Sequence, residues 1–447
     1  VERFLTFEQW WGGFYLLNDA EIHFIVDSLF VGNKLESGTL ELSPGRRINL
    51  QNIEEPVLVF SSQGDNITPP HQAMNWIKEV YGSVEELIRQ GRVLVYMVHD
   101  TIGHLGIFVS KSVAQKEHQQ ILEHVDLIQY LPPGLYEMII EEGDRILGLE
   151  DYRVRFEERT LDDFYQAGDS VHTPRSFQTV AAVSRMNDHI YRSLFRPWVR
   201  LFSNEASAEM MRQFHPLRMQ RYLFSDLNPF LAPFMLAASS IKENRQAASE
   251  QNTFRLVEQE TARMIESSLD LYREIRDRTQ EFLFKSIYEN PWVQEYFLGP
   301  HGRKGVDSDS ESEWQESRES LLHEFDRWLA RMSQGGFVEA AVRCLLAVMS
   351  TDELIRTEEL ELLKQIVDRH ERFRKMDATE LRQIIQDQAY LLRLDEARAL
   401  HALESMLPSR EDREEVVAVV RELAETDKNL SPEEKQLVRK IRQILNL

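Results

Sequence analysis

Two apolar, β-branched runs stand out from the mixed polar pattern near the start of the chain, and each leads into a loop. Pro56–Ser62 reads PVLVFSS, and Arg92–Val98 reads RVLVYMV. Such short apolar runs bounded by turn residues predict buried strands. Between them, Pro69 and Pro70 precede apolar residues at helical spacing, which predicts a helix. Strand, helix and strand indicate a parallel pair in an α/β sheet, and this alternation continues to about residue 130.

From about residue 175 to 298 the pattern changes to long helices. Between Phe254 and Phe282 the apolar spacing alternates three and four, but Ser268 and Arg278 interrupt it. This imperfect heptad predicts one face of a helical hairpin or bundle. A dimerising coiled coil is the alternative, and it would make the protein a homo-oligomer through this helical region.

Two aromatic stretches lie in this region. The first carries no charged residue, and the second has arginine residues placed between apolar ones. Asn228–Ile241 (NPFLAPFMLAASSI) is shorter than the roughly 20 residues that cross a bilayer, so no transmembrane segment is expected. We expect a buried helix there, with a docking face toward lipid or a granule surface as the alternative. Residues 191–202 (YRSLFRPWVRLF) are expected to form core, although they could also line an acyl pocket.

The last third of the chain is helix-patterned and contains an internal repeat. Residues 299–313 (GPHGRKGVDSDSESE) have the composition of a flexible linker. Beyond it, residues 348–366 match residues 423–441 at a constant offset of 75, and each copy is expected to end one helix and begin another. The predicted organisation is an α/β part (1–150), a helical region (151–298), a linker (299–317) and a duplicated, all-α bundle (318–447).

Charge and cysteine content narrow the class of protein. The formal net charge is −22, which leaves no broad basic field for nucleic acid or for anionic lipid head groups. Cys344 is the single cysteine, so no intrachain disulfide can form, and a cytoplasmic location is expected. The sequence opens at Val1 with a patterned aromatic segment and no charged leader, from which we expect a fragment lacking its amino-terminal part.

Asp65 and His104 are the candidate catalytic residues, because each occupies a loop directly after a predicted strand. In hydrolases with a nucleophile, acid and histidine in that chain order, the last two lie on loops at the carboxyl ends of late strands. Alternatively, Asp65 is a turn residue and His104 an ordinary loop histidine. His99 is the rival histidine, but His104 has Gly103 and Gly106 beside it, which allow close backbone approach.

The repeat also brings a recurring acidic pattern, which is a candidate site for calcium or magnesium. These divalent cations prefer oxygen ligands, and carboxylates from two related loops could converge on one ion. The competing interpretation is helix capping, since Ser431-Pro432-Glu433-Glu434 has the form of a helix start. The candidate ligands are Asp352, Glu358, Glu359, Asp427, Glu433 and Glu434.

Roughly the first 110 residues resemble the C-terminal half of the catalytic domain of polyhydroxyalkanoate synthases, which are α/β-hydrolase-type acyltransferases. The matching motifs are Asn33-Lys-Leu, the hairpin from Gly38-Thr-Leu-Glu-Leu to Ile48-Asn-Leu, Asn52-Ile, Pro56-Val-Leu, Gly64-Asp65-Asn-Ile-Thr-Pro69 and Gly103-His104-Leu-Gly-Ile. The resemblance implies that Asp65 is the acid of the Asp-x-Ile-x-Pro motif and His104 the general base. It also implies a partial α/β-hydrolase sheet.

Two features depart from that family. Neither G-x-C-x-G nor G-x-S-x-G occurs in the chain, so the nucleophile is expected upstream of Val1, and this chain alone should be inactive. Cys344 lies in an apolar helical run and is interpreted as a core residue. The segment SVEELIRQGR before the second strand is also longer than the synthases need.

The bundle from about Gly335 to Leu447 resembles the TerB-like module of tellurite-resistance proteins, whose halves carry an Asp-Gly-x-Leu-x-x-x-Glu signature. Glu353 and Lys428 replace the glycines. The leading hypothesis is therefore an acyltransferase or hydrolase acting on hydroxyacyl thioesters or esters, with no cofactor for catalysis. The alternative is a non-catalytic scaffold whose acidic bundle binds a partner or divalent cation in a stress response.

Overall fold

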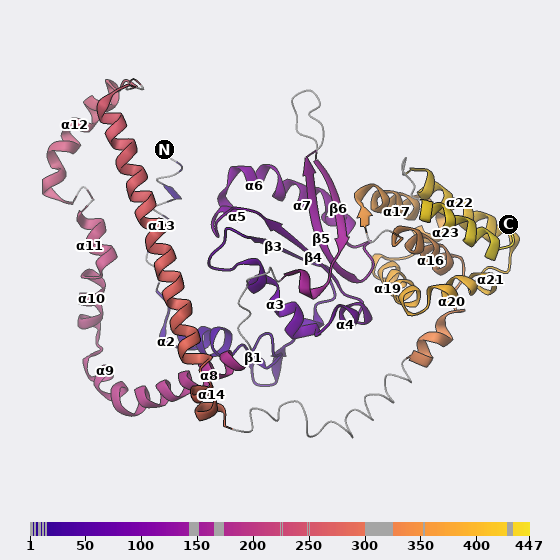
Figure 1. Cartoon of the computed structure of the whole chain (residues 1–447), viewed down its shortest axis with the longest axis horizontal. Helices are drawn as coiled ribbons and strands as arrows, with labels where there is room; N and C mark the ends of the chain where they lie inside the picture. Colours follow the sequence, from indigo (N-terminus) through magenta and orange to yellow (C-terminus); the bar gives the residue numbers. More distant parts are fainter. Residues whose placement is uncertain are drawn as a thin grey trace. The chain divides into compact units, whose positions relative to one another are not determined.

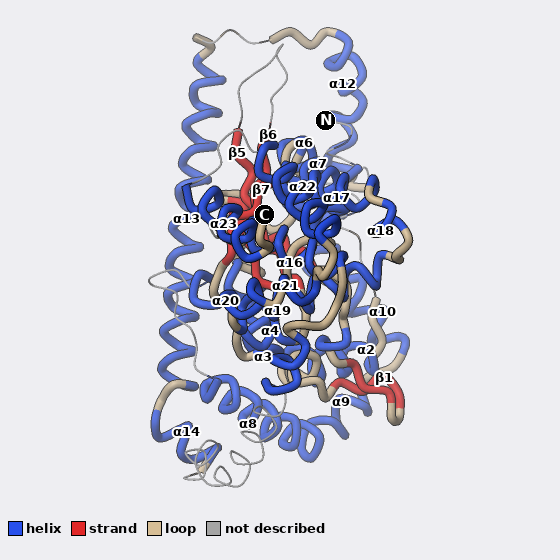
Figure 2. The backbone as a smooth tube through the Cα atoms, turned by 90° about the vertical axis from the view of Figure 1, so that its right-hand side faces the viewer, coloured by secondary structure: helices blue, strands red, loops and turns tan. Residues whose placement is uncertain are grey.

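The computed structural model shows a mostly helical chain with one mixed sheet (Figures 1 and 2). It divides into two compact units, Val1–Val171 with Asp309–Leu447, and His172–Ser308. The structure describes the chain except residues 1–2, 4–5, 8–9, 11–12, 14–15, 143–151, 165–173, 224, 226, 248, 250, 300–324, 352–353 and 427–431.

The central sheet of the first unit has five strands in the order β3-β4-β5-β6-β7. β3, β4 and β5 pair in parallel, whereas β6 and β7 join antiparallel. The predicted parallel pair of strands around a helix is thus confirmed. The strands are β3 (Val57–Ser62), β4 (Val93–His99), β5 (Gly134–Glu142), β6 (Tyr152–Glu158) and β7 (Leu354–Arg356).

Short helices and a separate hairpin surround these strands in the N-terminal part. The predicted helix between the first two strands is present, and the helical stretch after Gly103 forms three short helices. These elements are α2 (Asp19–Phe24), η1 (Ile25–Phe30), β1 (Leu40–Ser43), β2 (Arg46–Ile48), η2 (Leu50–Asn52), α3 (Pro70–Tyr81), α4 (Val84–Arg89), α5 (Gly106–Val109), α6 (Lys111–Gln115), α7 (Glu117–Ile128) and η3 (Leu161–Phe164).

Alternate residues of β4 enter two different cores, as the two-residue period of a strand requires. Leu94 and Tyr96 pack with α3 and α4 on one side. Val95 and Met97 belong to a second cluster that includes α7 and the C-terminal helices. Burial on both sides explains why the β4 sequence is continuously apolar rather than alternating.

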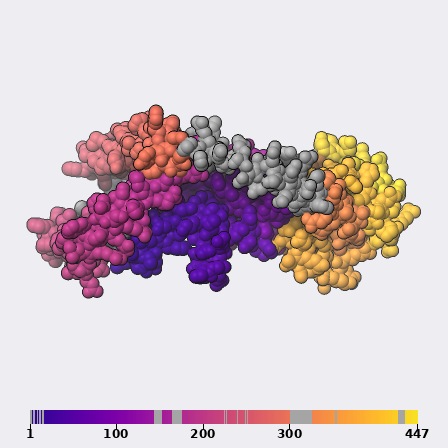
Figure 3. Space-filling model, turned by 90° about the horizontal axis from the view of Figure 1, so that it is seen from below, coloured from indigo at the N-terminus to yellow at the C-terminus, as the bar shows by residue number. Residues whose placement is uncertain are grey.

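The C-terminal helices form a rounded bundle, orange to yellow in Figure 3. Each copy of the repeat ends one helix and begins another, as expected: α16 ends at Met349 before α17, and α22 ends at Thr426 before α23. α16 packs against α19, α22 and α23. The helices are α16 (Phe337–Met349), α17 (Thr357–Arg369), α18 (Glu371–Arg374), α19 (Ala378–Leu394), α20 (Glu396–His401), α21 (Leu403–Met406), α22 (Arg410–Thr426) and α23 (Pro432–Ile444).

The bundle supplies the last strand of the sheet. Ile355 of β7 stands opposite Phe156 of β6, and both side chains are buried in the same core cluster. Thr357 Oγ1 then donates to the Val154 carbonyl at 3.0 Å. The segment predicted as a bundle of its own is therefore built into the sheet, although some 200 residues separate the two strands in the sequence.

The second unit is a series of helices whose apolar side chains are exposed. Its elements are α8 (Pro174–Ile190), η4 (Tyr191–Phe195), α9 (Arg196–Phe202), α10 (Glu205–Gln213), α11 (Pro216–Leu223), η5 (Pro229–Leu231), α12 (Ala232–Glu243), α13 (Thr253–Tyr288) and α14 (Pro291–Leu298). No large apolar side chain is buried among the described residues of this unit. No helix in the described part of the chain is both long and apolar enough to cross a membrane.

This exposure corrects two expectations. The helix expected to be buried at 228–241 is present as η5 and α12, but Phe230 and Leu236 are each 84% exposed. Residues 191–202, expected to form core, leave Trp198 65% exposed. Apolar content alone predicted burial of both stretches, but among the described residues of this unit no apolar layer covers them. The heptad helix α13 is likewise uncovered over most of its 36 residues.

Because the sheet and the bundle share one core, we expect them to unfold together when that core is destabilised. Phe156→Ala removes a fully buried ring at the β6–β7 pair and should cost about 3–5 kcal/mol of unfolding free energy. In hydrogen exchange, peptides from β4–β6 and from α17 and α22 should lose protection in parallel. Phe254→Ala, which removes an exposed ring on α13, is the control and should leave both unchanged. Loss confined to the strands would show that the bundle is an independent domain.

Candidate active site

Asp65 lies in the loop after β3 with its carboxylate fully buried. Its Oδ1 accepts hydrogen bonds from the backbone N–H groups of Ile67 (2.8 Å) and Thr68 (2.9 Å). Its Oδ2 accepts a further bond from the Thr68 hydroxyl at 2.9 Å. The loop therefore holds the carboxylate in one orientation before any partner from another loop is considered.

These hydrogen bonds decide the charge of the carboxyl group. Burial by itself raises the pKa of Asp65, but the bonds from the Thr68 backbone, His104, the Ile67 backbone and the Thr68 hydroxyl outweigh it and lower the pKa to about 2. A carboxylate that accepts several N–H bonds is favoured in its charged form. Asp65 is accordingly ionised at neutral pH.

His104 comes from the loop after β4 and meets this carboxylate. Its Nδ1 lies 2.8 Å from Asp65 Oδ2. An ionised carboxylate only accepts, so Nδ1 carries the proton and Nε2 keeps its lone pair. The ring is 34% exposed, and Phe108 packs edge-on beside it at 6.4 Å between centroids. Within the described part of the chain no hydrogen bond involves Nε2, so this nitrogen can accept a proton from a reacting group.

His99 has a different role. Its Nδ1 accepts from the backbone N–H groups of Thr101 (3.2 Å) and Ile102 (3.3 Å), and its Nε2 lies 3.9 Å from a Glu117 carboxylate oxygen. The ring therefore shapes the turn that carries His104. The preference for His104 over His99 as partner of the acid agrees with this geometry.

The two loops touch through their backbones at Gly64. A Cβ atom at this position would lie 2.2 Å from the Thr101 carbonyl oxygen. Ser62 adds a bridge, because its hydroxyl donates to the Ile102 carbonyl at 2.6 Å. The close backbone approach expected at Gly103 and Gly106 is found at Gly64 instead. A Cβ at Gly103 would meet only the Gly64 carbonyl oxygen at 4.0 Å, and a Cβ at Gly106 would lie 2.9 Å from the Ile102 side chain rather than from backbone.

Three residues that support the pair were given no role from the sequence: Ser62, Gly64 and Thr68. Thr68 had a readable signal, because an Asp followed three residues later by Thr suits a turn closed by the aspartate side chain. The two interpretations of Asp65 also prove compatible. It closes its own turn through Oδ1 and binds the histidine through Oδ2.

Cys344 is a core residue, as predicted. It lies in α16 with no exposed surface, and burial raises the pKa of its thiol to about 12. A thiol that stays protonated and buried cannot act as the nucleophile.

The acidic residues proposed as metal ligands are only partly visible. Asp352 and Asp427 lie outside the described residues. Glu358 and Glu359 begin α17, where a Glu359 carboxylate oxygen accepts from the Arg356 N–H at 2.8 Å, and Glu433 and Glu434 begin α23. Among the described residues no group of three or more His, Cys, Asp or Glu side chains is arranged to hold a metal. The cation site stays a prediction.

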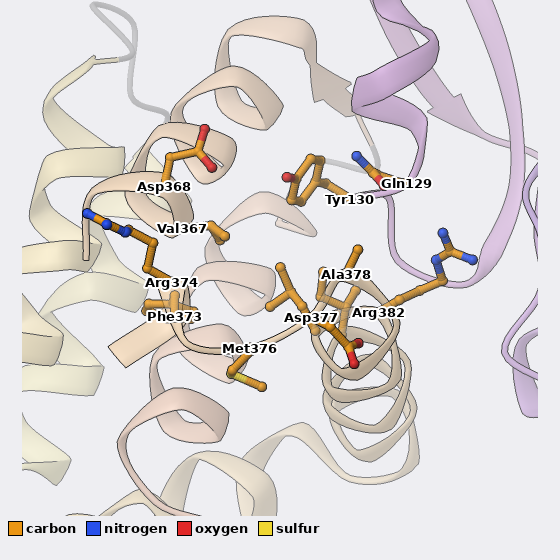
Figure 4. A pocket seen from close by; sticks show the side chains of 12 residues that line it. Gln129, Tyr130, Val367, Asp368, Phe373, Arg374, Met376, Asp377, Ala378 and Arg382 are labelled. Atoms are coloured by element: carbon orange, nitrogen blue, oxygen red, sulfur yellow. The ribbon is translucent and has the colours of Figure 1, made fainter. Parts of the chain in front are cut away.

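A cavity of about 200 Å³ lies between the end of α7 and helices α17–α19 (Figure 4). Tyr130, Val367 and Phe373 contribute apolar surface, and Asp368 and Arg374 contribute charge. Neither Asp65 nor His104 lines it, so it is separate from the acid–histidine pair.

Two curated proteins are similar to this chain. An "Uncharacterized protein in ackA 5'region" from Rhizobium meliloti is 35% identical over 438 residues, which is 95% of this chain and 58% of that protein. The chain thus spans less than two thirds of that relative. The poly(3-hydroxyalkanoate) polymerase subunit PhaC from Haloarcula marismortui is 32% identical over 113 residues, 25% of this chain and 21% of that protein. No solved structure matches.

Two family models match consecutive parts of the chain. The model for the tellurite resistance protein TerB matches residues 338–447, which confirms the TerB resemblance of the bundle. Residues 1–332 match a second model, which covers the whole acid–histidine pair and the helical unit. On that match, the chain belongs to the family described as "Protein of unknown function (DUF3141)".

Proposed function

We propose that this chain contributes the acid and the general base of an acyltransferase or hydrolase acting on hydroxyacyl thioesters or esters. The observation that carries the proposal is the 2.8 Å bond between the buried, ionised Asp65 and Nδ1 of His104. In this arrangement the carboxylate fixes the imidazole tautomer and stabilises its charged form. His104 Nε2 would take the proton of a hydroxyl or thiol nucleophile and return it to the leaving group.

The substrate class rests on similarity and on the surface beside the histidine. The similar protein from Haloarcula marismortui is named as a poly(3-hydroxyalkanoate) polymerase subunit, and the similarity covers a quarter of this chain. Phe108 and Val109 are exposed next to His104, and Ile67 is exposed beside Asp65. An apolar rim of this kind suits the alkyl part of an acyl group. In this proposal an α/β-hydrolase-type sheet presents the pair to a hydroxyl or thiol nucleophile.

Removing the base should abolish turnover without unfolding the protein. In the natural protein, assayed on a 3-hydroxyacyl thioester or a p-nitrophenyl ester, His104→Ala should lower kcat/KM by about 10³–10⁴-fold. His124→Ala is the matched control, because among the described residues that ring bonds the Gln120 carbonyl of its own helix. Unchanged activity of His104→Ala would remove the residue from the mechanism.

The charge of Asp65 should be visible in the pH dependence of stability. A carboxyl whose pKa falls from 3.8 to about 2 on folding stabilises the protein above pH 4, and this contribution disappears as the pH falls through 2. The difference in unfolding free energy between the protein and Asp65→Asn should not decline from pH 7 to 5 and should shrink by about 2 kcal/mol below pH 4. A difference that already declines between pH 7 and 5 would mean that the carboxyl is not held in this way.

The contact at Gly64 should make that position intolerant of any side chain. Gly64→Ala places a Cβ against the Thr101 carbonyl and should lower the unfolding free energy by about 1–3 kcal/mol. Gly103→Ala has open space and should change it by less than about 0.5 kcal/mol. Equal effects of the two substitutions in denaturant unfolding would contradict the close approach of the loops.

A further inference from the structure

The helices from Pro174 to Arg245 are basic, in contrast to the rest of the chain. This stretch holds ten arginine and lysine residues and five aspartate and glutamate residues, whereas the whole chain carries a net charge of −22. An excess of positive charge confined to one part of an acidic protein attracts an anionic partner locally.

The same helices expose their largest apolar side chains. Phe202 of α9, Phe230 of η5 and Phe234 of α12 are between 69% and 84% exposed. α12 carries no charged residue before Lys242. Exposed apolar surface of this extent marks a site of interaction.

In the segment from η4 to α9, arginine and apolar side chains occupy different sides of the helix. Arg192, Arg196 and Arg200 recur every fourth residue, so they follow one side of the helix. Leu194 and Trp198 are also four residues apart and follow another side. Arg192 pairs with Asp188, whereas neither Arg196 nor Arg200 makes an ion pair within the described ranges. Both guanidinium groups can therefore face an external anion.

We propose that the helices from α8 to α12 bind an anionic phospholipid surface, with their aromatic side chains in the acyl boundary and their arginines at the phosphate headgroups. Helices that lie in a membrane interface have this composition, with Trp, Phe and Leu on one face and Arg or Lys on the polar face. The long stems of arginine reach headgroups while the apolar face is buried. No helix needs to cross the bilayer for this mode of binding, in agreement with the hydropathy of the described helices.

The charge balance favours a lipid surface over a second copy of the chain for this segment. The long helix α13 shows the contrasting pattern: it has six basic and seven acidic residues and apolar residues at spacings of three and four. That pattern suits a protein partner, whereas an excess of arginine among exposed aromatics suits phosphate headgroups. The uncharged face of α12, centred on Phe234 and Leu236, is also unsuited to a nucleic-acid backbone.

Flotation with vesicles tests the proposal on the full chain. We expect the protein to float with vesicles of phosphatidylcholine and phosphatidylglycerol, to float less with phosphatidylcholine alone, and to be released by rising salt. Arg196→Gln with Arg200→Gln should weaken the partition coefficient by about 30-fold. Arg263→Gln with Arg276→Gln removes the same charge from α13 and should have little effect.

The apolar contribution is tested in the same way. Phe230→Ala with Phe234→Ala should weaken partition at least as much, and Phe254→Ala with Phe282→Ala on α13 should not. Absence of flotation, equal binding to neutral vesicles, or equal effects of the α13 controls would overturn the proposal. So would light scattering that shows a dimer dissociated by the Phe230 and Phe234 substitutions, because the covering surface would then be a second copy. These outcomes do not depend on the acid–histidine pair.

Discussion

The in-register parallel pairing of β3 and β4 is the constraint on which the candidate site depends. Ser62 stands opposite His99 at the ends of these strands, so the loops that follow leave the sheet side by side. At this edge Gly64 lies against Thr101, and that contact sets the distance over which the Asp65 carboxylate and the His104 ring meet. A strand register shifted by one residue would separate the two groups and turn their side chains to opposite faces.

The bundle is tied to the part of the sheet that carries this pair. α7 follows the His104 loop, and it packs against α17 of the bundle. At the end of α7, burial raises the pKa of Tyr130, with Asp368 of α17 adding to the effect. Gln386 of α19 donates to the Gly91 carbonyl at 2.7 Å, just before β4 begins. The TerB-like helices thus stabilise the strands from which both site loops emerge, whatever else they bind.

Local pattern predicted the site better than it predicted the packing. Asp65 and His104 could be located because each follows an apolar run that has no other plausible assignment than a strand. The β6–β7 pair could not be predicted in the same way, since β7 is only three residues long and its partner lies far away in sequence. The apolar content of 228–241 predicted burial, but hydrophobicity does not say what covers a surface, and within the described part of the chain Phe230 and Leu236 are each 84% exposed. The burial of Arg343 could not be predicted either, because its partners, the Gln388 side chain and two carbonyl groups, come together only in the folded bundle.

In the site described above, an ionised Asp65 holds the proton of His104 on Nδ1 and leaves Nε2 free. Nitrogen NMR of protein labelled in histidine measures this tautomer directly. At pH 8 we expect a protonated Nδ1 and an unprotonated Nε2 for the resonance that disappears in His104→Ala, with that preference lost in Asp65→Asn. A His104 ring protonated on Nε2, or one whose tautomer is indifferent to Asp65→Asn, would contradict it.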